Sequence, residues 1–119
     1  MRMLITGGSG FVGTHLAGLA LSKGYEISVL DLRRPSVKGA AFVKGDIRSQ
    51  ETVKKACKGA DVVVHLAAEK SVPRSIENPE ETMSINAVGT MNVLEASKEG
   101  MIVFTSSAAA YGNPTSLPI

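Results

Sequence analysis

The sequence has few of the residues that mark several large classes of protein. Cys57 is the single cysteine, so we expect neither a disulfide framework nor a metal site. The net charge of +2 is small and the basic residues are scattered, which argues against a nucleic-acid partner. No apolar run approaches the roughly 20 residues of a membrane span, and no signal peptide is visible. We therefore expect a cytoplasmic chain with no metal and no membrane or nucleic-acid partner.

The residues that are present suit a small α/β domain. Hydrophobic residues make up 44% of the 119 residues and aromatic residues only 4%, so the core must be mainly aliphatic. A chain of this length has room for one domain, here residues 1–119. Apolar segments suited to strands alternate with segments of helical periodicity. That alternation is typical of a parallel sheet covered by helices.

The pattern predicts five strands and three main helices. The expected strands are residues 2–6, 26–31, 41–44, 61–66 and 101–105, and the expected helices are residues 11–23, 49–58 and 79–98. We expect a loop over residues 70–74, and Met83, Met91 and Met101 in the core. The strands should form a Rossmann-type, doubly wound parallel sheet in the order 3-2-1-4-5, with helices on both faces.

The most informative segment is the glycine-rich turn after the first strand. Gly7, Gly10 and Gly13 lead directly into a helical pattern that starts at Phe11. Unpaired N–H groups and the dipole at a helix N-terminus favour an anion, and glycines let the backbone approach a pyrophosphate closely. The spacing is Gly-x-x-Gly-x-x-Gly rather than the common Gly-x-Gly-x-x-Gly. An ordinary glycine-rich loop is therefore the alternative.

An acidic residue follows the second expected strand at a suitable distance. Asp31 lies 18 residues after Gly13, close to the offset of about 20 residues at which a carboxylate accepts hydrogen bonds from an adenosine ribose. A lone aspartate after a strand can also be a turn or cap residue. Together with the glycine turn, Asp31 favours a dinucleotide site.

Five motifs in register resemble the extended short-chain dehydrogenase/reductase family, in its NAD-dependent epimerase/dehydratase branch. They cover nearly the whole chain and are residues 6–13 (TGGSGFVG), 45–48 (GDIR), 65–68 (HLAA), 86–96 (NAVGTMNVLEA) and 105–112 (TSSAAAYG). The resemblance implies NAD as the cofactor, with NADP less favoured because of Asp31. Arg33 and Arg34 leave a 2′-phosphate possible. The family resemblance also implies that a complete enzyme transfers hydride to and from NAD, with a keto-sugar as the intermediate.

The resemblance assigns roles to individual residues. Ser107 matches the family's catalytic Ser/Thr after the fifth strand. Asp46 and Ile47 match the pair that meets the adenine, and Lys70 would approach the nicotinamide side. The expected cofactor-binding residues are Gly7, Gly10, Phe11, Val12, Gly13, Asp31, Leu32, Arg33, Asp46, Ile47, Leu66, Ala67, Ala68, Lys70 and Thr105.

Structural alternatives remain open for several of these residues. Asp46 could cap a turn, Ser107 could only terminate a strand, and His65 is expected to be a packed structural residue. Asn86 could be a polar residue in the middle of a helix that bonds backbone across the sheet. Tyr111 is expected to be structural.

The chain departs from the family in its acid/base pair. The family uses Tyr-x-x-x-Lys, since a phenol needs a cationic neighbour to work near neutral pH. Here Val29 lies four residues after Tyr25 and Thr115 four residues after Tyr111. We therefore expect the NAD-binding portion of a nucleotide-sugar epimerase or dehydratase, truncated before the catalytic pair and the substrate region, and inactive alone.

Two other functions stay open: a non-catalytic NAD-binding regulatory module, and half of a split enzyme completed in trans. Enzymatic activity is therefore uncertain from the sequence. A nucleotide sugar is expected as substrate only of a complete enzyme. We also expect a homo-oligomer or a partner subunit, because the fifth strand would be an open sheet edge. The expected contact is that edge or the helix over residues 79–98.

Overall fold

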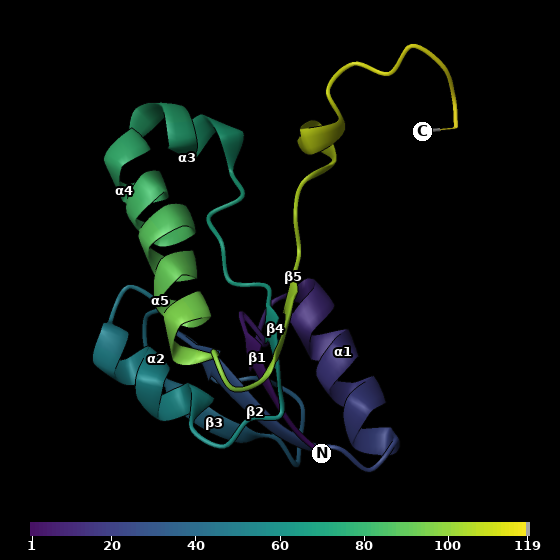
Figure 1. Ribbon diagram of the computed structural model, residues 1–119, viewed down its shortest axis with the longest axis vertical. Coiled ribbons are helices and arrows are strands. Elements are labelled where there is room, and N and C mark those ends of the chain that lie inside the picture. The colour runs from purple at the N-terminus through teal and green to yellow at the C-terminus, as the bar shows by residue number, and fades with distance from the viewer. Residues whose placement is uncertain (119) are drawn as a thin grey trace.

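Five parallel strands form a single sheet in the computed structural model, which describes residues 1–118 (Figure 1). The strands are β1 (Arg2–Thr6), β2 (Glu26–Asp31), β3 (Ala41–Lys44), β4 (Val62–His65) and β5 (Met101–Phe104). Their order is β3-β2-β1-β4-β5, which confirms the predicted topology. Because all five strands are parallel, their carboxyl ends meet at one edge of the sheet, where ligands bind in folds of this kind.

Helices cover both faces of the sheet (Figure 1). On one face α1 (Phe11–Ser22) packs through Ala17 and Ala20 against β1 and β2. On the other face α2 (Gln50–Cys57) and α5 (Gly89–Ala96) bury Val53 and Val93 against β1, β2 and β4. The aliphatic core predicted from composition is therefore divided into two layers. Burying side chains of this size contributes about 1.5–3 kcal/mol each.

The predicted start of α2 is confirmed in detail. The Ser49 hydroxyl accepts a hydrogen bond from the Thr52 N–H at 3.3 Å, as an N-cap residue does. Lys54 and Lys55 lie in the last turn, where the helix dipole favours positive charge.

The prediction of a loop over residues 70–74 is wrong. A short helix, α3 (Val72–Glu77), begins there, with Ser71 as its N-cap and Pro73 in its first turn. Proline is tolerated at that position because its missing N–H has no partner in a helix anyway. The sequence Ser-Val-Pro is therefore a helix start in this chain and not a loop.

The helix predicted over residues 79–98 is not one regular α-helix. It consists of α4 (Pro79–Met83), a π-helical turn η1 (Ser84–Val88) and α5, which ends at Ala96. The placement of the methionines in the core is also wrong: Met83, Met91 and Met101 are 64%, 58% and 64% exposed. The π turn adds a residue to one turn and rotates the face that follows it, so that in α5 Gly89 and Val93 are buried and Met91 is exposed. Met101 is exposed because it lies on the edge strand β5.

The edge strand β5 leaves apolar side chains uncovered. Met101, Val103 and Phe104 are all exposed, although Ile102 is partly buried. Beyond β5 the chain forms a short 3₁₀ turn, η2 (Ala108–Tyr111), that extends away from the sheet (Figure 1). Tyr111 is exposed in that turn. Within residues 1–118, no helix has the length and apolar character needed to cross a membrane.

Candidate functional site

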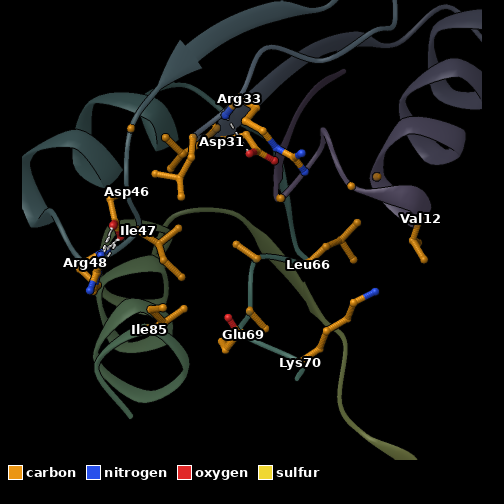
Figure 2. Close-up of a pocket in the computed structure, with 18 of the residues that line it drawn as sticks. Val12, Asp31, Arg33, Asp46, Ile47, Arg48, Leu66, Glu69, Lys70 and Ile85 are labelled. Carbon is orange, nitrogen blue, oxygen red and sulfur yellow. Dashed lines mark hydrogen bonds and ion pairs between the residues drawn. The ribbon is translucent and has the colours of Figure 1, made fainter. Parts of the chain in front are cut away.

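A cavity of about 620 Å³ opens at the carboxyl ends of the strands (Figure 2). Its lining combines the turn after β1, the end of β2, the segment after β3 and the segment after β4. Every cofactor-binding residue expected from the sequence lines it except Thr105. Segments far apart in the chain are thus brought together around one space.

The glycine turn forms one wall, and its glycines are required by geometry at two positions. Gly7 has φ of +70°, a conformation that other residues rarely adopt. A Cβ on Gly13 would lie 2.5 Å from the Gly8 Cα atom and 2.6 Å from the Gly7 carbonyl oxygen, so the helix packs directly on the turn. The resulting backbone is closely packed and has no side chain in the way of a ligand.

The N-terminus of α1 faces this cavity, and within residues 1–118 its first N–H groups have no hydrogen-bond partner. Gly10 is the N-cap and provides no side-chain hydrogen bond, and the first turn contains no acidic residue. Phe11, Val12 and Gly13 line the cavity, and the first α-helical bond is made by the Thr14 N–H. Their N–H groups and the helix dipole can therefore receive an anionic group.

Asp31 is held rigidly beside the glycine turn at the end of β2. Its two carboxylate oxygens accept hydrogen bonds from the Ser9 N–H at 3.0 Å and the Arg33 N–H at 3.1 Å. The Ser9 hydroxyl in turn donates to the Arg33 carbonyl at 2.5 Å. These contacts fix Asp31 next to the glycine turn. Each of its carboxylate oxygens can still accept a further hydrogen bond.

The segment after β3, with the predicted pair Asp46 and Ile47, forms another wall of the cavity (Figure 2). Arg48 binds the Asp46 carboxylate through both its Nε and Nη2 atoms, the latter at 2.6 Å. These hydrogen bonds hold the pKa of the Asp46 carboxyl below its usual range, and Asp46 raises that of Arg48. The Asn92 side chain fixes the Ile47 and Arg48 carbonyls at 3.0 Å each.

Asn86 attaches the segment after β4 to the helix layer. Its side chain accepts a hydrogen bond from the Glu69 N–H at 2.8 Å and donates to the Glu69 carbonyl at 2.9 Å. Asn86 therefore does bond backbone, but its partner is Glu69 in the segment after β4 and not backbone across the sheet. Leu66, Ala67 and Ala68, which precede Glu69, line the cavity.

The charges of the lining are mostly paired. Arg74 contacts Glu69 at 3.1 Å and Glu81 at 3.6 Å, and Arg48 pairs with Asp46. Arg33 and Lys70 make no ion pair with any side chain in the described part of the chain. Figure 2 shows these two cations on opposite sides of the space. Both remain available to an anionic ligand.

Thr105 and Ser107 are not brought into the cavity lining. The Thr105 hydroxyl donates to the His65 carbonyl at 3.1 Å and so continues the pairing of β5 with β4. The exposed Ser107 hydroxyl accepts a hydrogen bond from the Ala109 N–H at 3.2 Å and caps η2. In this chain both hydroxyls have structural partners.

Other lining residues were not predicted from the sequence: Leu30, Gly45, Arg48, Glu69, Arg74, Glu81 and Ile85. Arg48 could have been found, because it follows the pair Asp46 and Ile47 directly. Arg74 and Glu81 could not, because they reach the cavity only through α3 and α4, and the sequence predicts a loop over residues 70–74.

A parallel sheet in this order, with a glycine turn and an acidic residue at the end of β2, defines a Rossmann-type dinucleotide-binding domain. The chain belongs to the NAD-dependent epimerase/dehydratase family, which matches residues 3–119.

Relatives and solved structures support that membership. A UDP-glucose 4-epimerase from Streptomyces lividans is 38% identical over 99% of this chain and 39% of that protein. A UDP-glucose 4-epimerase from Klebsiella pneumoniae is 30% identical over 99% of this chain and 97% of that protein. The crystal structure of UDP-glucose 4-epimerase from Brucella ovis in complex with NAD is 34% identical, with a TM-score of 0.91 over 99% of this chain and 39% of that one. The chain therefore spans about two fifths of the length of most such relatives.

Proposed function

We propose that this chain binds NAD in the cavity, as the dinucleotide-binding part of a nucleotide-sugar epimerase or dehydratase. One observation carries the proposal. A single space is bounded by the N-terminus of α1, by Asp31 and by Ile47, which suit a pyrophosphate, a ribose and an adenine ring. The NAD complex of the Brucella epimerase, whose fold this chain shares, supports the choice of ligand.

Different residues of the cavity would contact different parts of NAD. Phe11, Val12 and Gly13 would donate backbone N–H groups to the pyrophosphate. Asp31 would accept hydrogen bonds from the adenosine ribose while Ser9 and Arg33 hold it in place. Lys70 would supply a positive charge toward the other half of the ligand. NAD, when bound, would supply the hydride acceptor for oxidation of a sugar.

A second function, a binding module or half of a split enzyme, is favoured by a specific observation. Neither Tyr25 nor Tyr111 has a lysine four residues later, and the hydroxyls of Thr105 and Ser107 lie outside the cavity lining. A partner that covers β5 could provide an acid/base pair. The lone, buried Cys57 supports a reducing, cytoplasmic location for either function.

Calorimetric titration of the chain with NAD⁺ tests the proposal. We expect saturable binding that is lost in Asp31→Ala and in Gly10→Val. Asp61→Ala is the matched control, because the Asp61 carboxylate also accepts a backbone hydrogen bond, from the Arg2 N–H at 2.7 Å, at the opposite end of the sheet. Absence of NAD⁺ binding by the folded chain would refute the proposal as it stands.

An assay with UDP-glucose and NAD⁺ tests whether the chain acts on a nucleotide sugar by itself or only with a partner. Epimerisation by the chain alone would establish an enzyme with an unusual acid/base group. NAD⁺ binding without turnover is expected of the cofactor-binding part alone and of a binding module. Turnover that appears only when a partner with a Tyr-x-x-x-Lys pair is added would favour the split enzyme.

A further inference from the structure

A series of side-chain hydrogen bonds runs from β1 through β4 to α5, and His65 is at its centre. The His65 Nδ1 atom lies 2.6 Å from the Thr6 hydroxyl, and its Nε2 atom lies 3.0 Å from the Thr90 hydroxyl. Thr6 is the last residue of β1 and Thr90 lies in α5. His65 therefore links the strand that enters the glycine turn to the helix layer.

The partners of the two threonines fix the direction of every bond. The Thr90 hydroxyl donates its one hydrogen to the Asn86 carbonyl at 2.7 Å, so it must accept a hydrogen bond from His65 Nε2. A neutral imidazole with a proton on Nε2 has an acceptor at Nδ1. The Thr6 hydroxyl must then donate to Nδ1, and it accepts from the Ala67 N–H at 3.3 Å. The neutral Nε2–H tautomer satisfies all of these groups.

The surroundings of the ring favour this neutral form. His65 and Thr6 are 3% and 0% exposed. The ring faces Thr6 from β1, Thr90 from α5 and Phe104 from β5, whose ring centroid lies 5.9 Å away. Among residues 1–118 no carboxylate pairs with it, and burial lowers the pKa of the His65 imidazole. A second proton on Nδ1 would leave the buried Thr6 hydroxyl hydrogen without its acceptor.

Both ends of the series reach the cavity wall after β4. At one end the Ala67 N–H is bound by Thr6. At the other end Asn86, which receives the Thr90 hydrogen bond, holds both the N–H and the carbonyl of Glu69. The wall also touches the glycine turn, because a Cβ on Gly7 would lie 2.8 Å from the Ala67 nitrogen. A shift of His65 would therefore change the width of the cavity between the turn and this wall.

We propose that His65, as the neutral Nε2–H tautomer, is a positioning residue that holds Ala67 and Glu69 at a fixed distance from the glycine turn. Its effect on ligand affinity rests on the proposed NAD site, whereas its effect on the wall is a property of the free chain. The two can be tested separately.

The first test is made on the free chain by ¹⁵N NMR. The chemical shifts of Nδ1 and Nε2 distinguish the two neutral tautomers and the charged form, and exposed His15 provides a second histidine in the same spectrum. We expect Nε2–H at neutral pH, and the same neutral form persisting below pH 6.5, the ordinary histidine pKa. An Nδ1–H tautomer, or a charged ring at neutral pH, would overturn the proposal whether or not NAD binds.

The second test compares amide hydrogen exchange in matched variants. Thr6→Val removes the bond at one end of the series, Thr90→Val removes the bond at the other, and both are nearly isosteric. Thr82→Val is the control, because the Thr82 hydroxyl also donates to the carbonyl four residues earlier but lies outside the cavity lining. We expect at least about tenfold faster exchange at Ala67 in Thr6→Val and at Glu69 in Thr90→Val. Unchanged exchange at both amides would refute the positioning role.

Two conservative variants separate positioning from simple filling of the core. In His65→Asn the side-chain carbonyl can still accept from Thr6, and in His65→Gln the amide can still donate to Thr90. We expect Asn to keep Ala67 protected and Gln to keep Glu69 protected, and each to weaken NAD⁺ binding about tenfold, which corresponds to about 1.4 kcal/mol. Loss of protection at both amides in both variants would mean that His65 is only core packing. If the wild-type chain fails to bind NAD⁺ while the tautomer and exchange results hold, the proposed function fails and the positioning role stands.

Discussion

The Cδ1 atom of Ile47 lies 2.5 Å from the position that a Cβ atom on Gly89 would occupy. Gly89 is buried in α5, and Ile47 lines the cavity on the side away from it. The absence of a side chain at position 89 therefore lets the helix support Ile47 from behind. Glycine inside a helix otherwise costs about 1 kcal/mol relative to alanine.

Gly89→Ala should push Ile47 into the cavity. Overpacking costs about 1–3 kcal/mol, and the better helix propensity of alanine offsets about 1 kcal/mol. We expect the free energy of unfolding in urea to fall by about 1 kcal/mol and NAD⁺ affinity to fall about tenfold. Adding Ile47→Val removes the Cδ1 methyl group but keeps the Cγ1 atom, which would lie 2.7 Å from the new Cβ, so it should recover only part of both losses. Full additivity of the two substitutions would contradict this account.

Gly13→Ala should be far more damaging than Gly89→Ala, because the atoms in its way belong to backbone. The new Cβ would lie 2.5 Å from the Gly8 Cα atom, which no rotamer change can move. We expect a loss of about 3 kcal/mol in the free energy of unfolding, with no detectable NAD⁺ binding. Gly18→Ala, in the same helix with nothing within 4 Å, should instead stabilise the chain by up to about 1 kcal/mol. Similar effects for the two variants would exclude close packing of α1 on the turn.

The glycine turn, Asp31 and the strands were predictable because their signals are local. The glycine spacing and an aspartate at a strand end are visible in the order of the residues, and the φ of +70° at Gly7 fits the tight turn expected there. The exposed Met91 was not predictable in the same way, since the π turn η1 changes the helical phase only after Val88. The π turn contains Asn86, whose side chain binds the backbone of Glu69, 17 residues earlier in the chain. A contact of that kind depends on tertiary structure and leaves no periodic signal.

The choice between NAD and NADP should depend on Asp31 and one of the two arginines that follow it. Arg33 lines the cavity, whereas the Arg34 guanidinium lies over the Phe42 ring at 5.0 Å from its centroid. Asp31→Asn removes the charge that would repel a 2′-phosphate. We expect it to raise NADP⁺ affinity about tenfold and to lower that for NAD⁺, measured by calorimetry.

The double variants identify the arginine that receives the phosphate. Adding Arg33→Ala to Asp31→Asn should abolish the gain in NADP⁺ affinity, and adding Arg34→Ala should leave it intact. The opposite result would assign the 2′-phosphate to Arg34.

The stability of the chain should depend on the pH through His65. Burial lowers its folded-state pKa, so below about 6.5 the unfolded chain binds a proton that the folded chain does not. The stabilising contribution is therefore complete above about pH 6.5 and is lost as the pH falls toward the lowered pKa, by at most about 1.4 kcal/mol per pH unit. Urea unfolding of wild type and His65→Gln between pH 7.5 and 5 should show a difference that narrows as the pH falls. A constant difference would mean that His65 titrates alike in both states.

Self-association should occur through the uncovered edge strand β5. Met101 and Val103 are exposed there, and an unpaired strand with apolar side chains can pair with a second copy. Met101→Lys and Val103→Lys place a charge on that edge and should convert associated chains to monomers in sedimentation velocity. Met91→Lys adds the same charge at a side chain that is 58% exposed, but in α5, and so tests the alternative contact through the helix over residues 79–98. If Met91→Lys disrupts association and the β5 variants do not, the contact lies on that helix. A wild-type chain that is monomeric at high concentration would exclude both surfaces.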